Sequence, residues 1–326
     1  MNIFCVQFKV TERDFHSDLF RVHVEDFYKK TEPGDLIIFP EDIGLLVAFE
    51  GISAQTVTDA IQQVYLKNEG KIKEKFQDSS LLKQLFLSLT DEFAKGFYEF
   101  FSALSAKYNV YTMACNNMAE FKRVGESYLP VNSDVLNTCF VFDESGRVLQ
   151  RQSKVNLTKM EAGLGIDCAR IEDVKTFKLN GIRFGIAISL DAFSVDYIYR
   201  LRDAEIVVQP DANPQRWNGY LENGRWQPEE WMDSSYYIAQ RLPDVKYVVN
   251  PMMVGSLFDI RFEGQSCIAK KADMNDTKMG YIGNQLTSGF AGMMNIEDYD
   301  PKDFVERTQV VGRDLDYPEG FIQIEV

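Results

Sequence analysis

Residues 181–214, which read GIRFGIAISLDAFSVDYIYRLRDAEIVVQPDANP, carry the pattern that decides the fold. An apolar run of strand length ends at Ser189, a helix-like segment follows, and a second apolar run at residues 206–209 stops at Pro210. A strand, a helix and another strand in succession are typical of layered α/β domains. We expect the corner at Ser189 to expose its side chain beside unpaired backbone N–H groups.

The same alternation extends over the rest of the chain. Between residues 82 and 104, Leu and Phe recur at steps of three and four, which predicts a helix with one apolar face. No Pro/Gly/Ser-rich linker divides the chain, so we predict one domain over residues 1–326 with a helical insertion around residues 60–104. Strand-length apolar runs lie at residues 3–8, 36–39, 110–114, 139–142, 184–190, 206–209 and 247–250.

Composition excludes several classes of partner. The 326 residues carry 35 Lys and Arg against 49 Asp and Glu, a net charge of −14, which disfavours binding to the phosphates of nucleic acid. Every apolar run is shorter than the roughly 20 residues that cross a bilayer, and no signal-peptide pattern opens the sequence, so we expect no membrane partner. The five cysteines lack CxxC spacing, which favours a reduced, cytoplasmic protein.

The sequence also lacks the motifs of several enzyme classes. His16 and His23 are the only histidines, and no GxSxG, HExxH, EF-hand loop, GxGxxG or P-loop occurs. We therefore expect no metal ion and no cofactor, which leaves the chemistry of carboxylates, lysine, and hydroxyl or thiol groups. Such groups follow buried runs at three places, where catalytic side chains of layered folds project: Glu41 in DLIIFPEDIG, Lys154 in LQRQSKVNLTKMEAGLG, and Ser189.

In this order the segments resemble the nitrilase, or carbon–nitrogen hydrolase, superfamily. The resemblance implies an α/β layered chain folded as a four-layer α-β-β-α sandwich. It also implies a Glu-Lys-Cys mechanism that hydrolyses amides, nitriles, N-carbamoyl compounds or related non-peptide C–N bonds without metal or cofactor. Because Leu190-Asp191 stands where true nitrilases have Trp-Glu, an amidase or carbamoylase is favoured. The matching segments are IFCVQF (3–8), FPE (39–41), KVNLTKME (154–161), GIRFGIAISLD (181–191), AEIVVQPDANPQRW (204–217) and VNPMMVGS (249–256).

The resemblance also assigns roles to individual residues. Glu41 would be the general base, and Lys154 would stabilise the oxyanion together with the backbone N–H of Leu190. Glu161 would be a second glutamate that orients the substrate or the lysine. Weaker candidates for substrate contact follow the next strand: Asn213, Pro214 and Trp217.

Ser189 departs from the family, which has its nucleophilic cysteine at this position. A serine hydroxyl needs far stronger activation than a thiol, and a glutamate is a poor base for that task. We therefore expect little or no hydrolase activity. The serine is either an engineered replacement or a natural one in a catalytically dead relative with a binding or regulatory role. A third reading is a true serine enzyme with Glu41 as its base.

The expected partner is a small amide or carbamoyl compound, and the resemblance implies a homodimer or a larger homo-oligomer. The stretch around residues 60–104 makes the interval between Glu41 and Lys154 long for the family. It would either extend an outer layer of helices or form a lid or an oligomer contact.

Overall fold

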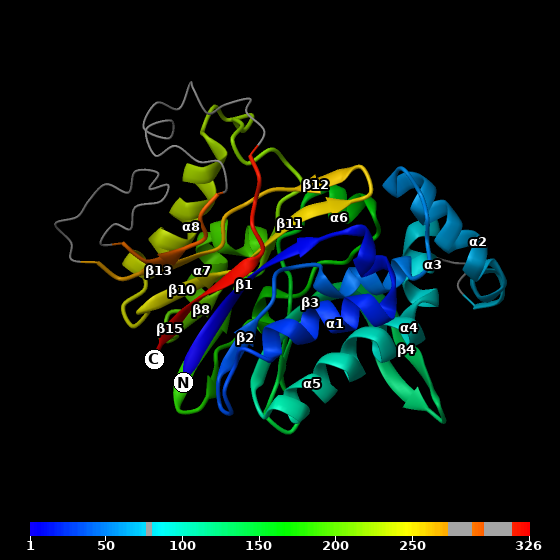
Figure 1. Ribbon diagram of the computed structural model, residues 1–326, viewed down its shortest axis with the longest axis horizontal. Coiled ribbons are helices and arrows are strands. Elements are labelled where there is room, and N and C mark those ends of the chain that lie inside the picture. Colours follow the sequence, from blue (N-terminus) through cyan, green and yellow to red (C-terminus); the bar gives the residue numbers. More distant parts are fainter. Residues whose placement is uncertain (76–79, 273–288, 297–314) are drawn as a thin grey trace.

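The computed structural model describes residues 1–75, 80–272, 289–296 and 315–326. At its centre two β-sheets lie face to face, with helices on the outer side of each (Figure 1). The strands of the larger sheet are β1 (Asn2–Val10), β2 (Leu36–Ile38), β3 (Tyr111–Val124), β4 (Ser127–Phe142), β5 (Val148–Ser153), β9 (Asp211–Ala212), β11 (Met252–Leu257), β12 (Ile260–Phe262) and β15 (Gly320–Glu325). Those of the smaller sheet are β6 (Phe177–Leu179), β7 (Ile182–Ile186), β8 (Ile206–Val208), β10 (Tyr247–Asn250), β13 (Cys267–Lys270) and β14 (Phe290–Met293).

The order of the strands mixes both ends of the chain. Within the described residues the larger sheet runs β12-β11-β1-β2-β3-β4-β5, with β9 beside β11, and β15 pairs antiparallel with β1. The smaller sheet runs β14-β13-β10-β8-β7-β6. Parallel pairs join β1 to β2, β2 to β3, and β7 to β8. The carboxyl ends of such strands share an edge, which brings the segments after them together.

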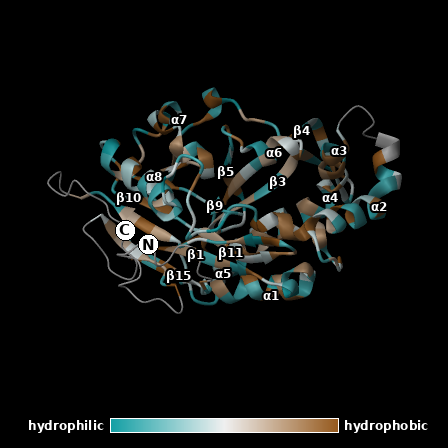
Figure 2. Cartoon of the chain, turned by 90° about the horizontal axis from the view of Figure 1, so that it is seen from above, coloured by the Kyte–Doolittle hydropathy of each residue, from teal (hydrophilic) through white to brown (hydrophobic). Residues whose placement is uncertain are grey.

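The helices are short to medium in length. Those next to the larger sheet are α1 (Ser17–Tyr28), α2 (Val57–Lys75), α3 (Leu81–Ser88), α4 (Thr90–Phe93) and α5 (Phe100–Tyr108), with a π-helical turn at Ala94–Glu99 and 3-10 helices at Glu12–Phe15 and Ile43–Phe49. The others are α6 (Lys159–Gly163), α7 (Val195–Arg200), α8 (Gln227–Arg241), and 3-10 helices at Ile171–Asp173 and Ser189–Phe193. Figure 2 shows both teal and brown residues along α1 and α2, as expected for helices with one buried face.

Three clusters of buried apolar residues define four layers. The first packs α1 to α5 on the larger sheet, for example Phe97 against Phe140 of β4. The second packs α7 and α8 on the smaller sheet. The third lies between the sheets, with Cys5 and Ile38 from one and Ile186 and Val208 from the other. Helices, sheet, sheet and helices follow one another, so the predicted α-β-β-α sandwich is confirmed.

Strand alternation explains how one strand serves two of these interfaces. In β1, Ile3 and Cys5 face the other sheet, whereas Phe4, Val6 and Phe8 face the helices. Side chains along a strand point to opposite faces with a period of two, so a strand covered on both sides is apolar at most of its positions, with the buried Gln7 as an exception in β1.

The stretch around residues 60–104 contributes to the outer helical layer. Ala60, Val64 and the Phe-rich segment from Phe86 to Phe101 are buried in the helix–sheet cluster, although residues 76–79 lie outside the described part of the chain. A close contact fixes the π-helical turn, since a Cβ on Gly96 would lie 2.5 Å from Cγ1 of Val47. The boundary of an insertion, and of a single domain over the whole chain, stays a prediction.

One strand is shorter than the sequence indicates. The apolar run at residues 184–190 was expected to continue to its end, but β7 stops at Ile186 and a 3-10 helix begins at Ser189. Ala187 and Ile188 are fully buried, so the run stays apolar after the ladder ends. An apolar run indicates that a segment is buried, but it does not indicate where the hydrogen bonds of the strand end.

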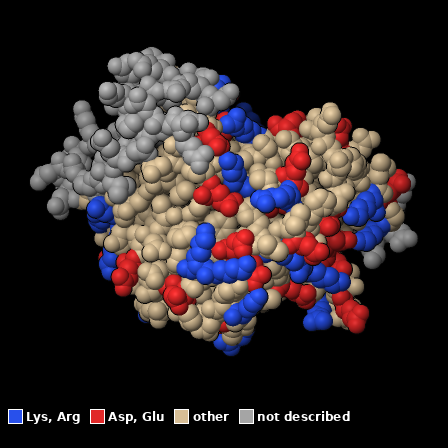
Figure 3. Space-filling model, viewed as in Figure 1, with Lys and Arg blue, Asp and Glu red and all other residues tan. Residues whose placement is uncertain are grey.

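On the face seen in Figure 3, acidic and basic side chains lie interspersed. On α1, His23 Nδ1 lies 2.6 Å from Asp14 Oδ1, and its Nε2 contacts Glu319 just before β15. Burial alone would lower the pKa of His23, but the two carboxylates raise it to about 9.

No helix among the described residues is both long and apolar enough to span a bilayer.

Candidate functional site

Three predicted residues directly follow strands. Glu41 comes after β2 and the buried Phe39, and Lys154 is the residue after β5. The backbone N–H of Lys154 donates to the carbonyl of Asn137 at 2.8 Å, which continues the pairing of β5 with β4. Ser189 opens the 3-10 helix beyond β7. Three separate segments, each after a strand, thus contribute one residue each to the same region.

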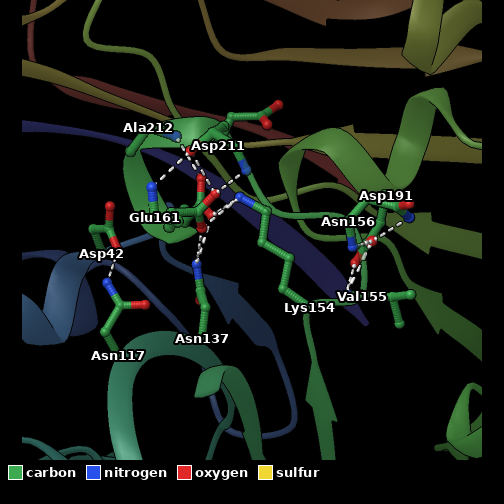
Figure 4. A network of polar contacts seen from close by, with 12 residues as sticks. Asp42, Asn117, Asn137, Lys154, Val155, Asn156, Glu161, Asp191, Asp211 and Ala212 are labelled. Atoms are coloured by element: carbon green, nitrogen blue, oxygen red, sulfur yellow. Dashed lines mark hydrogen bonds and ion pairs between the residues drawn. The ribbon is translucent and has the colours of Figure 1, made fainter. Parts of the chain in front are cut away.

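Lys154 lies between two carboxylates in the interior. Its Nζ donates to Oε1 of Glu41 at 2.7 Å and to Oε1 of Glu161 at 2.8 Å. Only 1 % of Lys154 is exposed, against 3 % of Glu41 and 8 % of Glu161. Asn137 joins both acids, because its Nδ2 donates to Glu41 at 2.7 Å and to Glu161 at 3.3 Å (Figure 4). We call Glu41, Lys154, Glu161 and Asn137 the lysine cluster.

The two glutamates of the lysine cluster are shifted in opposite directions. Burial raises the pKa of Glu41 above its usual range, against the charge of Lys154, and repulsion from Glu161 adds to the increase. Burial would also raise the pKa of Glu161, but the Lys154 charge and hydrogen bonds from Thr158 lower it overall. Glu41 is therefore the stronger base of the two, and Glu161 stays ionised.

Of the two carboxylate oxygens of Glu41, Oε2 has fewer hydrogen bonds. Oε1 accepts from Lys154 and Asn137, whereas Oε2 accepts a single long hydrogen bond, 3.3 Å from the backbone N–H of Ala212, among the described residues. A carboxylate oxygen has about two acceptor sites, so Oε2 can take up a proton without breaking the contact with Lys154.

A helix cap holds Glu161 in place. In the sequence Thr158-Lys159-Met160-Glu161, the Thr158 hydroxyl accepts from the Glu161 N–H at 3.1 Å, and Glu161 Oε2 accepts from the Thr158 N–H and hydroxyl at 2.8 Å each. This is the reciprocal capping box of a helix N-terminus. It occupies Oε2 and leaves Oε1 for Lys154.

Ser189 has an unusual backbone. Its φ of 49° lies in the left-handed region, which non-glycine residues rarely adopt and which costs free energy of order 1–3 kcal/mol. The expected exposure of its side chain is wrong, because the residue is only 3 % exposed. Its own N–H is paired, since it donates to the carbonyl of Pro210 at 3.1 Å. Within the described chain, no hydrogen bond joins its hydroxyl to Glu41 or Lys154. Leu190 follows in the first turn of the 3-10 helix, where N–H groups have no partner within the helix.

Two links connect the Ser189 corner to the lysine cluster. Asp191 accepts from the N–H of Asn156 at 2.8 Å, from its Nδ2 at 2.8 Å and from the N–H of Val155 at 3.2 Å, so it grips the segment after Lys154 (Figure 4). On the other side, Pro210 bonds Ser189 and lies two residues before Ala212, which bonds Glu41. Burial raises the pKa of Asp191 to about 6, against these hydrogen bonds.

The three weaker candidates have different surroundings. Asn213 is buried, and its amide donates to the carbonyls of Gln215 and Glu263 and accepts from Gln227. Trp217 is fully buried, with its indole N–H on Gln265. Pro214 lines a cavity of about 540 Å³ together with Met160, Arg216, Asp259, Ile260, Arg261 and Glu263. Of these lining residues, Met160 immediately precedes Glu161 in the chain.

Several members of the site escaped sequence analysis. Asn137 interrupts the apolar run of β4, and such a polar residue inside a strand signals a buried contact. Asp42 and Asp211 lie next to recognised positions and carried no signal of their own. The cysteines are free: Cys168 is exposed, and the buried ones are Cys5, Cys115, Cys139 and Cys267. Among the described residues, no three His, Cys, Asp or Glu side chains lie together so as to hold a metal ion.

Comparisons with known proteins agree on the fold. No protein-family model and no curated protein sequence matches the chain. Among solved structures, a cysteine mutant of Nesterenkonia AN1 amidase from the nitrilase superfamily matches 100% of this chain and 90% of its own, with a TM-score of 0.56 at 11% identity. A carbon-nitrogen hydrolase from Helicobacter pylori G27 matches 83% of this chain and 82% of its own, with a TM-score of 0.54 at 16% identity.

A third structure is longer than this chain. Glutamine-dependent NAD+ synthetase from Acinetobacter baumannii matches 99% of this chain over 45% of its own, with a TM-score of 0.55 at 15% identity. All three solved structures share this fold at low sequence identity to the chain. They confirm the fold that the sequence resemblance implied. The chain has the fold of the nitrilase-superfamily carbon–nitrogen hydrolases.

Proposed function

We propose that this chain is a carbon–nitrogen hydrolase of the amidase type whose nucleophile position is occupied by Ser189. The observation that carries the proposal is the buried contact of Lys154 with Glu41 and Glu161, linked to the Ser189 corner on two sides, in the fold of known amidases. The substrate would be a small amide or N-carbamoyl compound, acted on in a reducing, cytoplasmic setting by a homo-oligomer.

The reaction follows from the lysine cluster. Glu41 Oε2 takes the proton of the nucleophile, and the nucleophile attacks the carbonyl carbon of the substrate. The negative charge on the carbonyl oxygen is stabilised by Lys154 and the backbone N–H of Leu190. When the C–N bond breaks, Glu41 returns the proton to the leaving ammonia or amine. Glu41 then takes a proton from a water, whose oxygen attacks the acyl carbon. The bond between the acyl carbon and the nucleophile breaks, Glu41 returns the proton to the nucleophile, and the acid product ionises to the carboxylate.

Ser189 limits this sequence at its first step. Burial makes Glu41 a stronger base than an ordinary carboxylate, but the gap to a serine hydroxyl stays far wider than the gap to a thiol. Little or no turnover is expected from the chain as it stands. A non-catalytic role in binding or regulation is the second candidate, and the missing hydrogen bond between the Ser189 hydroxyl and Glu41 favours it.

Ammonia release separates these candidates. The chain and its Ser189→Cys variant are assayed on short aliphatic amides, ω-amides of dicarboxylic acids, N-carbamoyl amino acids and simple nitriles. Both are prepared with Cys168→Ser, because the exposed thiol of Cys168 could react by itself. Turnover by the Cys variant alone, abolished by Glu41→Gln, supports the hydrolase. Natively folded Cys variants without turnover on any substrate contradict it, and turnover by Ser189 itself points to a serine enzyme.

A further inference from the structure

Next to Glu41, the chain turns at Asp42. Asp42 has φ 63°, in the left-handed region, and is partly exposed, unlike the buried Glu41. Its Oδ1 accepts from Nδ2 of Asn117 at 2.8 Å, and its Oδ2 accepts from no described residue. Asn117 is 4 % exposed, and its Oδ1 has no partner among the described residues. In Figure 4 this oxygen points from Asn117 toward Asn137.

Asn137 presents a second oxygen of this kind. Asn117 on β3 and Asn137 on β4 are direct partners in the antiparallel ladder, so their side chains lie on the same face about 5 Å apart at Cβ. Asn137 is fully buried and donates its Nδ2 to Glu41 and Glu161, while its Oδ1 has no partner in the described part of the chain. Buried polar atoms are nearly always satisfied, so these two oxygens call for a donor other than the described residues.

The charge of this region is unbalanced in the same sense. Among the described residues, Lys154 is the cation that interacts with five carboxyl groups, those of Glu41, Asp42, Glu161, Asp191 and Asp211. Burial and repulsion from Glu41 and Glu161 raise the pKa of Asp42 well above its usual range. A ligand that brings positive charge to Asp42 would relieve both the repulsion and the burial cost.

We propose that Asp42, Asn117 and Asn137 form a subsite beside Glu41 and Lys154 that binds an ammonium group of the substrate. This inference rests on the proposed function and narrows it to amides that also carry a primary amine. An ammonium has three N–H donors and no acceptor, which matches one free carboxylate oxygen and two free amide oxygens. The partial exposure of Asp42 gives the group a route from solvent.

Calorimetric titration tests the subsite without turnover. The full chain, with Ser189 in place, is titrated with butylammonium chloride, and with sodium chloride, sodium butyrate and butanol as probes that lack one feature each. Butylammonium alone should bind. Asp42→Asn, which keeps an acceptor for Asn117 but removes the charge, and Asn117→Ala should each weaken binding about tenfold or more. Asp173→Asn, at an exposed acid in a 3-10 helix outside the site, should change nothing.

Two results would overturn the subsite. One is no binding of butylammonium by a natively folded chain, and the other is binding that Asp42→Asn leaves unchanged or that Asp173→Asn weakens equally. A circular-dichroism melt of each variant establishes that it is folded. Sodium binding with the same dependence on Asp42 would also count against the subsite, because the site would then recognise a cation that has no N–H donors.

Kinetics with Ser189→Cys separate failure of the subsite from failure of the hydrolase. An amide with a terminal ammonium is compared with an uncharged amide of the same length. Asp42→Asn should raise the ratio of KM for the charged amide to KM for the uncharged one about tenfold or more. Turnover of both amides with no effect of Asp42→Asn keeps the hydrolase and rejects the subsite. No turnover, together with butylammonium binding through Asp42, keeps the subsite and rejects the hydrolase.

Discussion

Replacing Lys154 by methionine should destabilise the fold strongly, because it leaves two buried carboxylates without their cation. Lys154 is 1 % exposed and lies 2.7 Å from Glu41 and 2.8 Å from Glu161. Methionine fills most of the lysine volume, so the expected loss is electrostatic and not a cavity. Removing one partner of a buried ion pair costs about 3–5 kcal/mol of unfolding free energy. Equilibrium denaturation in urea at pH 8 measures this loss.

A control and a pH series sharpen the reasoning. Lys95 also lies 2.7 Å from its partner Asp91, but both side chains are substantially exposed, so Lys95→Met should leave the unfolding midpoint almost unchanged. In Lys154→Met the two acids lose the cation that lowers their pKa, so the pKa of each rises. The folded state then binds protons more readily than the unfolded chain, so the deficit should shrink as pH falls from 8 to 5.

The combined variant Lys154→Met, Glu41→Gln, Glu161→Gln completes the series. With no charge left in the cluster, it should recover most of the stability lost in the single variant. The reasoning is refuted if Lys154→Met unfolds at the same urea concentration as the parent, or if its deficit is independent of pH. Either result would mean that water reaches the lysine cluster and screens its charges.

Three further predictions concern other parts of the fold. The contacts of protonated His23 should stabilise the chain fully below pH 6.5 and be lost as pH rises through about 9; urea midpoints from pH 6 to 10 should fall over that range, and His23→Gln should flatten the curve. Asp191→Ala leaves the donors of residues 155–156 without an acceptor and should cost about 1–3 kcal/mol in denaturation, whereas Asp191→Asn, which keeps one oxygen, should cost less. A Cβ on Gly44 would lie 2.5 Å from Asn116, so Gly44→Ala should cost about 1–3 kcal/mol in urea, while Gly70→Ala in α2, with nothing within 4 Å, should not destabilise.

The layers of the fold could be predicted from the sequence because local patterns of apolar residues indicate which segments are buried. Continuous apolar runs mark strands covered on both sides, as in β1, and the Phe recurrence predicted the helices over 81–108. The end of β7 was not readable, since Ala187 and Ile188 stay buried after the ladder stops. Ladder hydrogen bonds depend on the partner strand, which a single segment does not encode.

The candidate site was readable only in part. Glu41, Lys154 and Glu161 follow strands or open a helix, and the structure places them within hydrogen-bond distance of one another. Asn137 and Asp191 act through long-range contacts, to Glu41 and to Asn156, and the local sequence does not indicate the partner of either residue. Sequence reasoning therefore finds the charged groups that follow strands and misses the neutral and acidic groups that orient them.

Stability alone does not account for the lysine cluster and its neighbours. A buried ion pair is at best neutral relative to apolar packing of the same volume, and Asp42 and Asp211 add carboxyl groups whose burial raises their pKa values further. The left-handed backbone at Asp42 and Ser189 adds strain at the same place. Costs of this kind cluster where a protein holds charged groups for a ligand. The fold has such costs on both sides of Lys154, which supports the proposal of a binding site here whether or not Ser189 acts as a nucleophile.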